Sequence, residues 1–145
     1  MQTISNNPAA VLSACIAIAI FLWNEWKERH HLRICCYCLH EEISLHQNWL
    51  HFMMEGDPNM GEIFLSPDAT REFDNIKYDN IFRRMDQNDF EVIFAHYRKI
   101  TSLRLVIQKS AQIGIRNIYS LEILEADLAS CSRALKVLEK NLPKH

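Results

Sequence analysis

The chain has 145 residues, a formal net charge of −2, and only three glycines and four prolines. The slightly negative charge argues against recognition of nucleic acid through a basic surface, and we expect no nucleic-acid partner. The scarcity of glycine argues against a phosphate-binding loop, and neither a P-loop nor a dinucleotide fingerprint is present. So few residues that break helices favour an all-α fold.

The first 24 residues carry no charged side chain, and residues 8–23 form an unbroken apolar run, PAAVLSACIAIAIFLW. A helix needs about 20 apolar residues to cross a bilayer, with a lower limit of about 17. Trp23 and Trp26 extend the run at an interface, where indole rings prefer to lie. A buried core helix would carry a polar stripe, and a cleaved signal peptide would begin with positive charge. Neither feature is present, so residues 1–26 are predicted to be a single transmembrane anchor.

Basic residues follow the apolar run and none precedes it. Lys27, Arg29 and Arg33 lie just after the predicted span. The positive-inside rule therefore places the N-terminus outside and the C-terminus in the cytoplasm, at an inner (cytoplasmic) membrane. The five cysteines form no evenly spaced framework, which is typical of reduced thiols in a cytosolic compartment.

Small residues recur along the predicted span. A face of small side chains lets two helix backbones approach closely in lipid. A span near the lower length limit also favours association, because oligomerisation relieves hydrophobic mismatch. Small residues are alternatively the ordinary composition of a membrane helix. We predict a homo-oligomer that packs in the lipid bilayer through Ala9, Ala10, Ser13, Ala14 and Ala17.

The pattern beyond the anchor predicts about four helices in an antiparallel cytoplasmic bundle over residues 27–145. The first continues from the anchor to about residue 55, because no Gly or Pro occurs in residues 9–55. A loop over residues 56–66 follows. The later helices are expected at about residues 67–85, 89–113 and 117–142. About 120 residues suffice for one core and are too few for two.

Two heptad seams, with apolar residues at alternating spacings of three and four, predict packing between helices. The first consists of Leu32, Cys36, Leu39, Ile43, His46, Leu50 and Met53. The second consists of Leu121, Leu124, Leu128, Cys131, Leu135, Leu138 and Leu142. Both are interpreted as core of one chain, and the first seam could instead pair with copies of itself.

One set of residues has the helical spacing of metal ligands. Cys38, Glu42 and His46 lie four residues apart, at which zinc ligands on a helix converge. No CxxC pair and no second half-site accompany them, and small thiols are ordinary core residues. We therefore predict no metal and no other cofactor. His46 is alternatively a hydrogen-bonded or pH-sensitive core histidine.

Six residues separate Arg33 from His40. This spacing resembles the loose Rx4–6H motif of HEPN ribonucleases, which are also small helical bundles. In that family the Arg and His serve RNA cleavage at a dimer interface. The resemblance covers two residues, and it implies catalytic roles for Arg33 and His40.

Three functions follow as hypotheses. The leading one is a small single-pass membrane protein, not an enzyme, that self-assembles and perturbs or permeabilises the inner membrane. Toxins and antiviral (phage-defence) effectors share this layout by analogy. The second is a membrane-anchored adaptor that holds a cytosolic protein partner through its last helix or its basic third helix. The third is an anchored HEPN-like ribonuclease.

Overall fold

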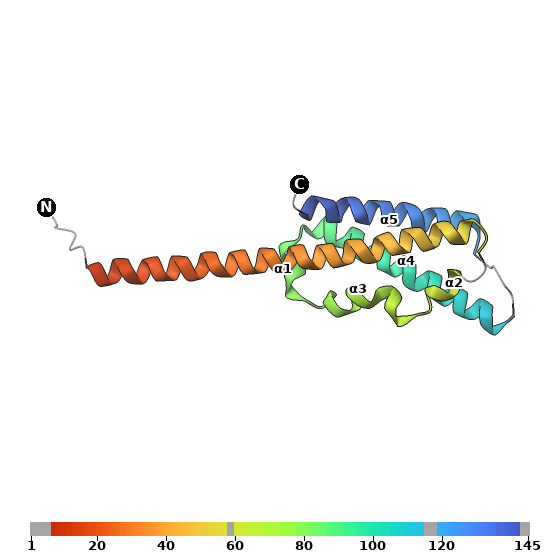
Figure 1. Ribbon diagram of the computed structural model, residues 1–145, viewed down its shortest axis with the longest axis horizontal. Coiled ribbons are helices and arrows are strands. Elements are labelled where there is room, and N and C mark those ends of the chain that lie inside the picture. Colours follow the sequence, from red (N-terminus) through yellow and green to blue (C-terminus); the bar gives the residue numbers. More distant parts are fainter. Residues whose placement is uncertain (1–6, 58–59, 115–118, 143–145) are drawn as a thin grey trace.

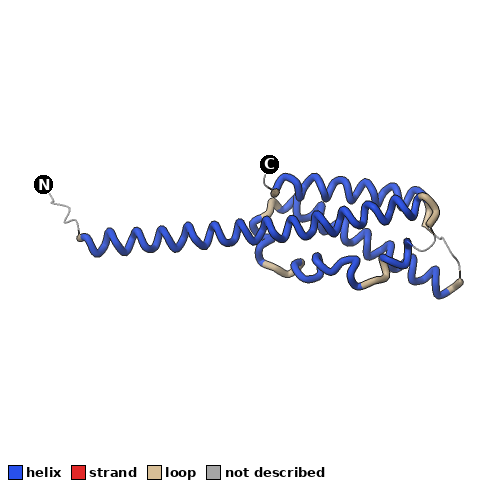
Figure 2. Tube along the Cα trace, viewed as in Figure 1, coloured by secondary structure: helices blue, strands red, loops and turns tan. Residues whose placement is uncertain are grey.

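The computed structural model describes residues 7–57, 60–114 and 119–142, and within them all regular structure is helical (Figure 1, Figure 2). The all-α prediction is confirmed. The elements in chain order are α1 (Pro8–Met54), α2 (Met60–Ile63), η1 (Pro67–Thr70), α3 (Arg71–Ile76), η2 (Asn80–Arg84), α4 (Gln87–Gln112) and α5 (Leu121–Asn141), where η marks a 3-10 helix.

α1 has 47 residues and two different halves. At 1.5 Å per residue the helix is about 70 Å long. Its first half, here called the stem (residues 8–26), projects alone from the molecule, and its second half lies in the bundle (Figure 1). The Asn7 side chain caps the helix by accepting from the Ala9 N–H, and Gly56 follows its end with a φ of +89°. The left-handed conformation at Gly56 is one that glycine adopts without steric cost.

The chain passes along the bundle four times in alternating directions (Figure 1). The second half of α1 and the antiparallel α5 lie side by side, and α4 packs against α5. The segment from α2 to η2 connects α1 to α4 in the sequence and runs back along the bundle. We call it the return pass. The core between these passes includes Leu39 and Ile43 from α1, Ile93 and Tyr97 from α4, and Leu138 from α5, each at most 2% exposed.

The return pass is not the continuous helix predicted for residues 67–85. It is divided into η1, α3 and η2. In a continuous α-helix the Phe73 N–H would donate to the Ala69 carbonyl. Side chains of α1 engage both groups instead: the Glu42 carboxylate accepts from the Phe73 N–H, and His46 Nε2 donates to the Ala69 carbonyl. Tertiary hydrogen bonds thus replace the local ones at this point.

Other boundaries also differ from the prediction. The short helix α2 lies within the predicted 56–66 loop. α4 starts before residue 89, because the Asp86 side chain accepts from two backbone N–H groups of its first turn. The Ser120 side chain caps α5, and the predicted start at residue 117 lies outside the described residues.

The structure places both seams in the interior of one chain. On the first seam every residue but Leu32 is buried, and Leu32 packs against the core. The surface that could have paired with copies of α1 is therefore occupied. On the second seam Leu124, Cys131 and Leu138 are buried, while the other members are partly buried. Leu121 is the exception: it is 56% exposed in the first turn of α5, so its predicted place on the seam is wrong.

Seam residues are buried and Leu121 is exposed, so truncation to alanine should lower the free energy of unfolding by different amounts at the two kinds of position. Leu39→Ala, at a fully buried position, should lower the unfolding free energy by about 2–5 kcal/mol, because it removes buried surface and leaves a cavity. Leu121→Ala should change it by less than about 0.5 kcal/mol. Denaturant unfolding of the detergent-solubilised chain measures both, and equal losses would contradict the assignment.

Candidate functional site

Five buried polar side chains, in two hydrogen-bonded groups, cross the bundle and join three helices. Glu42 and His46 come from α1, His96 and Tyr97 from α4, and Cys131 from α5. None is more than 5% exposed. Polar groups at this depth destabilise a fold unless they find hydrogen-bond partners, so each contact in the chain is needed. We call these five residues the polar chain.

Glu42 is the acceptor of the polar chain. Its carboxylate accepts from the Tyr97 hydroxyl at 2.6 Å, from the Glu72 N–H at 2.7 Å and from the Phe73 N–H at 3.3 Å. The last two groups belong to the first turn of α3, whose N–H groups have no partner within the helix. Burial raises the pKa of Glu42, although all three hydrogen bonds favour its charged form. Glu42 therefore caps α3 from another helix.

The two histidines form a hydrogen-bonded pair with assigned tautomers. Because the Ala69 carbonyl can only accept, His46 Nε2 carries a proton and donates it there, and the neutral ring accepts at Nδ1. His96 Nε2 then donates to His46 Nδ1 across 3.0 Å. The remaining nitrogen, His96 Nδ1, accepts from the Cys131 thiol at 3.8 Å. Every donor in this series has one acceptor, provided that both rings are neutral.

Burial keeps both rings neutral at ordinary pH. It lowers the pKa of His46 to about 4 and that of His96 to about 3. Burial also raises the pKa of Cys131 to about 12, so that its thiol stays protonated and unreactive as a nucleophile. The arrangement favours a structural role for the polar chain: it holds α1, α4, α5 and the return pass in one register.

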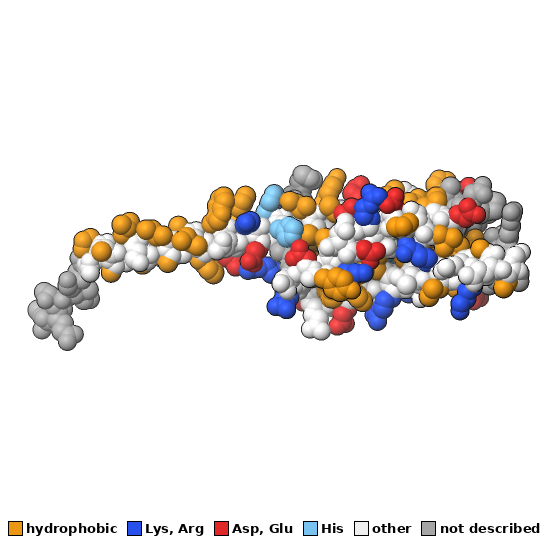
Figure 3. Space-filling view, turned by 90° about the horizontal axis from the view of Figure 1, so that it is seen from below, with side chains coloured by type: hydrophobic (Ala, Val, Ile, Leu, Met, Phe, Trp, Pro, Cys, Tyr) orange, Lys and Arg blue, Asp and Glu red, His pale blue; other side chains and the backbone are white. Residues whose placement is uncertain are grey.

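A second cluster joins the stem to the bundle. The Arg84 guanidinium, from η2, donates to both carboxylate oxygens of Glu25 at 2.8 and 3.0 Å and also pairs with Glu28. On α1 itself, Trp26 stacks on Trp23 and His30 with ring centroids 5.3 and 5.4 Å apart. Figure 3 shows apolar side chains along the face of the stem in view and the first charged ones at this junction. Bidentate arginine–carboxylate pairs define an orientation, so the junction fixes how the stem leaves the bundle.

The predicted ribonuclease pair lies on the surface of α1. Arg33 is exposed, and His40 is half-buried. The His40 ring lies 3.8 Å from the Glu41 carboxylate and 3.7 Å from that of Glu139 on α5. Seven positions along a helix put Arg33 and His40 about 10 Å apart along its axis.

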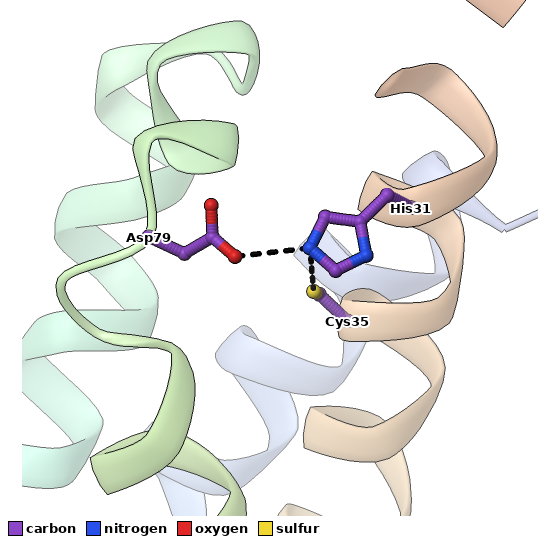
Figure 4. Close-up of side chains that lie close together, drawn as sticks. All are labelled: His31, Cys35 and Asp79. Atoms are coloured by element: carbon purple, nitrogen blue, oxygen red, sulfur yellow. Dashed lines mark hydrogen bonds and ion pairs between the residues drawn. The ribbon is translucent and has the colours of Figure 1, made fainter. Parts of the chain in front are cut away.

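The predicted metal ligands are divided between different environments. Glu42 and His46 belong to the polar chain and use their oxygens and nitrogens in hydrogen bonds. Cys38 is half-buried. Among the described residues the structure gathers a different group of three potential ligands, His31, Cys35 and Asp79 (Figure 4).

All five small residues predicted to pack in the membrane are exposed, and they lie on the stem away from the bundle. The first seam predicts His46 as a buried histidine, whereas no prediction covers His96, its partner. The sequence does contain a signal for His96. It is a histidine on an apolar helix face, between Ile93 and Ile100, just as His46 is a histidine on the apolar first seam. Arg84 gave no local signal, because Glu25 is 59 positions away.

No protein-family model matches this sequence, and comparisons with curated proteins and with solved structures find no match.

The neutral histidines predict a loss of stability in acid. Unfolded histidine has a pKa near 6.5, whereas the folded values are about 4 and about 3. Between these limits the unfolded state binds more protons, so the contribution is complete above pH 6.5 and falls as pH decreases. Each histidine loses at most about 1.4 kcal/mol per pH unit. Glu42 and Asp127, whose pKa values burial raises, oppose this trend with the reverse sign.

Comparison with His96→Gln isolates the histidine contribution from that of the acids. The difference in unfolding free energy between wild type and variant should be largest above about pH 7 and should shrink as pH falls toward about 4.5. Denaturant unfolding at a series of pH values measures it. His51→Gln changes an exposed histidine near the end of α1 and serves as control. A pH-independent difference would contradict the assigned neutral pair.

Proposed function

We propose that this chain is a single-pass inner-membrane protein whose stem crosses the bilayer and associates with other copies, and that the assembly perturbs or permeabilises the membrane as a toxin or phage-defence effector. One observation carries the proposal. Residues 8–24 are exposed, uncharged and mostly apolar, on the one helix of the described residues that is long and apolar enough to span a membrane.

The stem favours lipid over a protein partner as its surroundings. Its large side chains are exposed all round the helix, among them Leu12 at 63%, Ile18 at 59% and Phe21 at 62%. Successive positions differ by about 100° around the axis, so no polar face remains to meet water. A partner groove would cover one side only, whereas a bilayer covers every side.

The length of the stem supports the same conclusion. Residues 8–26 make a helix about 28 Å long, against a hydrocarbon thickness of about 30 Å. Trp23 and Trp26 mark the end nearer the bundle, at the depth where indoles favour the interface. Lys27, Arg29 and Arg33 are exposed just beyond them, which supports a cytoplasmic bundle by the positive-inside rule.

We assign assembly to the stem because the seam in the bundle that could pair with other copies is already buried within the chain. The first seam is buried within the chain, while the small residues at positions 9, 13 and 17 are exposed and lie on one side of the stem. Small residues permit the close helix approach on which packing in lipid depends. The contact between copies therefore falls in the membrane.

The position of these small residues also leaves room for the bundles. They lie at the end of the stem far from the bundle, and Ser13 is about 27 Å along the axis from His31. Two helices that cross at Ser13 by about 40°, as in right-handed small-residue pairs, separate by a further 18 Å or so at that level. This separation is perpendicular to the contact distance of about 8 Å at the crossing point, so the two axes are about 20 Å apart at His31, which matches the roughly 20 Å width of a four-helix bundle.

The test is expression of the full chain in bacterial cells with a dye that reports membrane potential. Wild type should depolarise the membrane, and the variant Ala9→Leu, Ser13→Leu, Ala17→Leu should lose most of this effect, since bulky residues keep the helices apart. The matched control is Cys15→Leu, Ala19→Leu, which adds bulk on the opposite side of the stem and should act as wild type.

Other outcomes distinguish the alternatives. Equal depolarisation by all three proteins would contradict packing through the small residues. Recovery of the wild-type chain in the soluble fraction without detergent would contradict the membrane span. Harmless expression together with one specific co-purified cytosolic protein would favour the adaptor. RNA degradation that Arg33→Ala or His40→Ala abolishes would favour the ribonuclease.

A further inference from the structure

Three potential metal ligands converge where the bundle begins below the stem. His31 and Cys35 lie one turn apart on α1, and Asp79 comes from the turn between α3 and η2 (Figure 4). His31 Nε2 lies 2.9 Å from Asp79 Oδ2 and 3.9 Å from Cys35 Sγ. The three ligand atoms all lie within 4.8 Å of one another.

These distances are close to those of a tetrahedral zinc centre. Zinc binds nitrogen and oxygen at about 2.0–2.2 Å and sulfur at about 2.3 Å. With tetrahedral angles, the ligand atoms are about 3.3 Å apart for nitrogen–oxygen and about 3.6 Å for nitrogen–sulfur. The His31–Asp79 and His31–Cys35 separations each differ from these values by a few tenths of an ångström, which side-chain rotation can supply.

We propose that His31, Cys35 and Asp79 bind a Zn²⁺ ion, with water in the fourth position. One thiolate, one imidazole and one carboxylate are a donor set that suits zinc, whereas magnesium and calcium prefer oxygen ligands alone. The thiolate and the carboxylate together neutralise the ion. This proposal is independent of the assembly through the stem.

The exposure of the three side chains shows which side of the site is open to solvent. Cys35 is 3% exposed and lies at its base, while the side chains of His31 and Asp79 are 51% and 35% exposed at its rim. An ion can therefore enter from solvent, and its fourth position faces outward. An open fourth position is the arrangement of zinc sites that bind water or a further ligand.

Proton balance follows from the same geometry. Without metal, His31 Nε2 donates to the Asp79 carboxylate. Burial, with the nearby Asp79 charge, raises the pKa of Cys35 to about 11, so its thiol is protonated. On binding, the imidazole takes the tautomer with its proton on Nδ1, the thiol releases one proton to solvent, and a zinc–sulfur bond forms.

The site lies next to the ion pairs of Arg84 with Glu25 and Glu28. Both clusters connect α1 to the end of the return pass. A bound ion would thus add a second tie across the junction between stem and bundle, at the level where the proposed span leaves the membrane.

The experiment uses the full chain in detergent, stripped of metal with a chelator. Titration with Co²⁺ should produce thiolate-to-cobalt charge-transfer absorption that saturates at one equivalent, and Zn²⁺ should abolish it by displacement. Asp79→Asn should weaken binding by at least about 10-fold to 100-fold, because changes to outer-shell partners alone already cost that much. Cys35→Ser should remove the charge-transfer absorption altogether.

His30→Asn and Cys38→Ser are the matched controls, since each changes a potential ligand on the same helix outside the group, and both should bind as wild type does. Circular dichroism establishes that each variant is folded. Asp79 lies at the rim, so the result does not depend on how the buried Cys35 tolerates substitution. Absence of Co²⁺ and Zn²⁺ binding by wild type, or wild-type affinity in Asp79→Asn, would overturn the proposal.

Discussion

The bundle depends on α1 holding the hydrogen bonds that the return pass would otherwise make with itself. Glu42 and His46 engage the Phe73 N–H and the Ala69 carbonyl, which are partners in a continuous helix. Unpaired buried groups are costly, so once α1 takes them the return pass must break at that point. The break lets Phe73 stack on Tyr97 with ring centroids 3.9 Å apart. One helix therefore sets the shape of its neighbour.

The exposure of α1 also supports the proposal that copies associate through the stem and not through the bundle. One face of its second half, which carries the first seam, is buried within the chain, whereas its first half is exposed throughout residues 8–24. Association through the first seam would require the bundle to open and the polar chain to lose its partners. Association through the stem requires neither, and it leaves the surface near His31 and Asp79 in contact with solvent.

Sequence periodicity was sufficient for the fold class and for the apolar stem, because both follow from side chains that are neighbours along one helix. It placed Leu121 on the second seam, since periodicity carries no information on where a bundle ends. It predicted one helix over residues 67–85, because local propensity cannot reveal that Glu42 takes two of its N–H groups. The pairing of His31 with Asp79, 48 positions away, required the tertiary structure.

Because α1 is one unbroken helix, a tilt of the stem would move the far end of the bundle. From Lys27 to Met54 the helix extends about 40 Å beyond the stem. Helices in bilayers tilt by about 20° on average, which would swing the distal end sideways by about 14 Å. Thinner or thicker lipid would change this angle. A single rigid rod would thus convert membrane thickness into the location of the loop around Gly56.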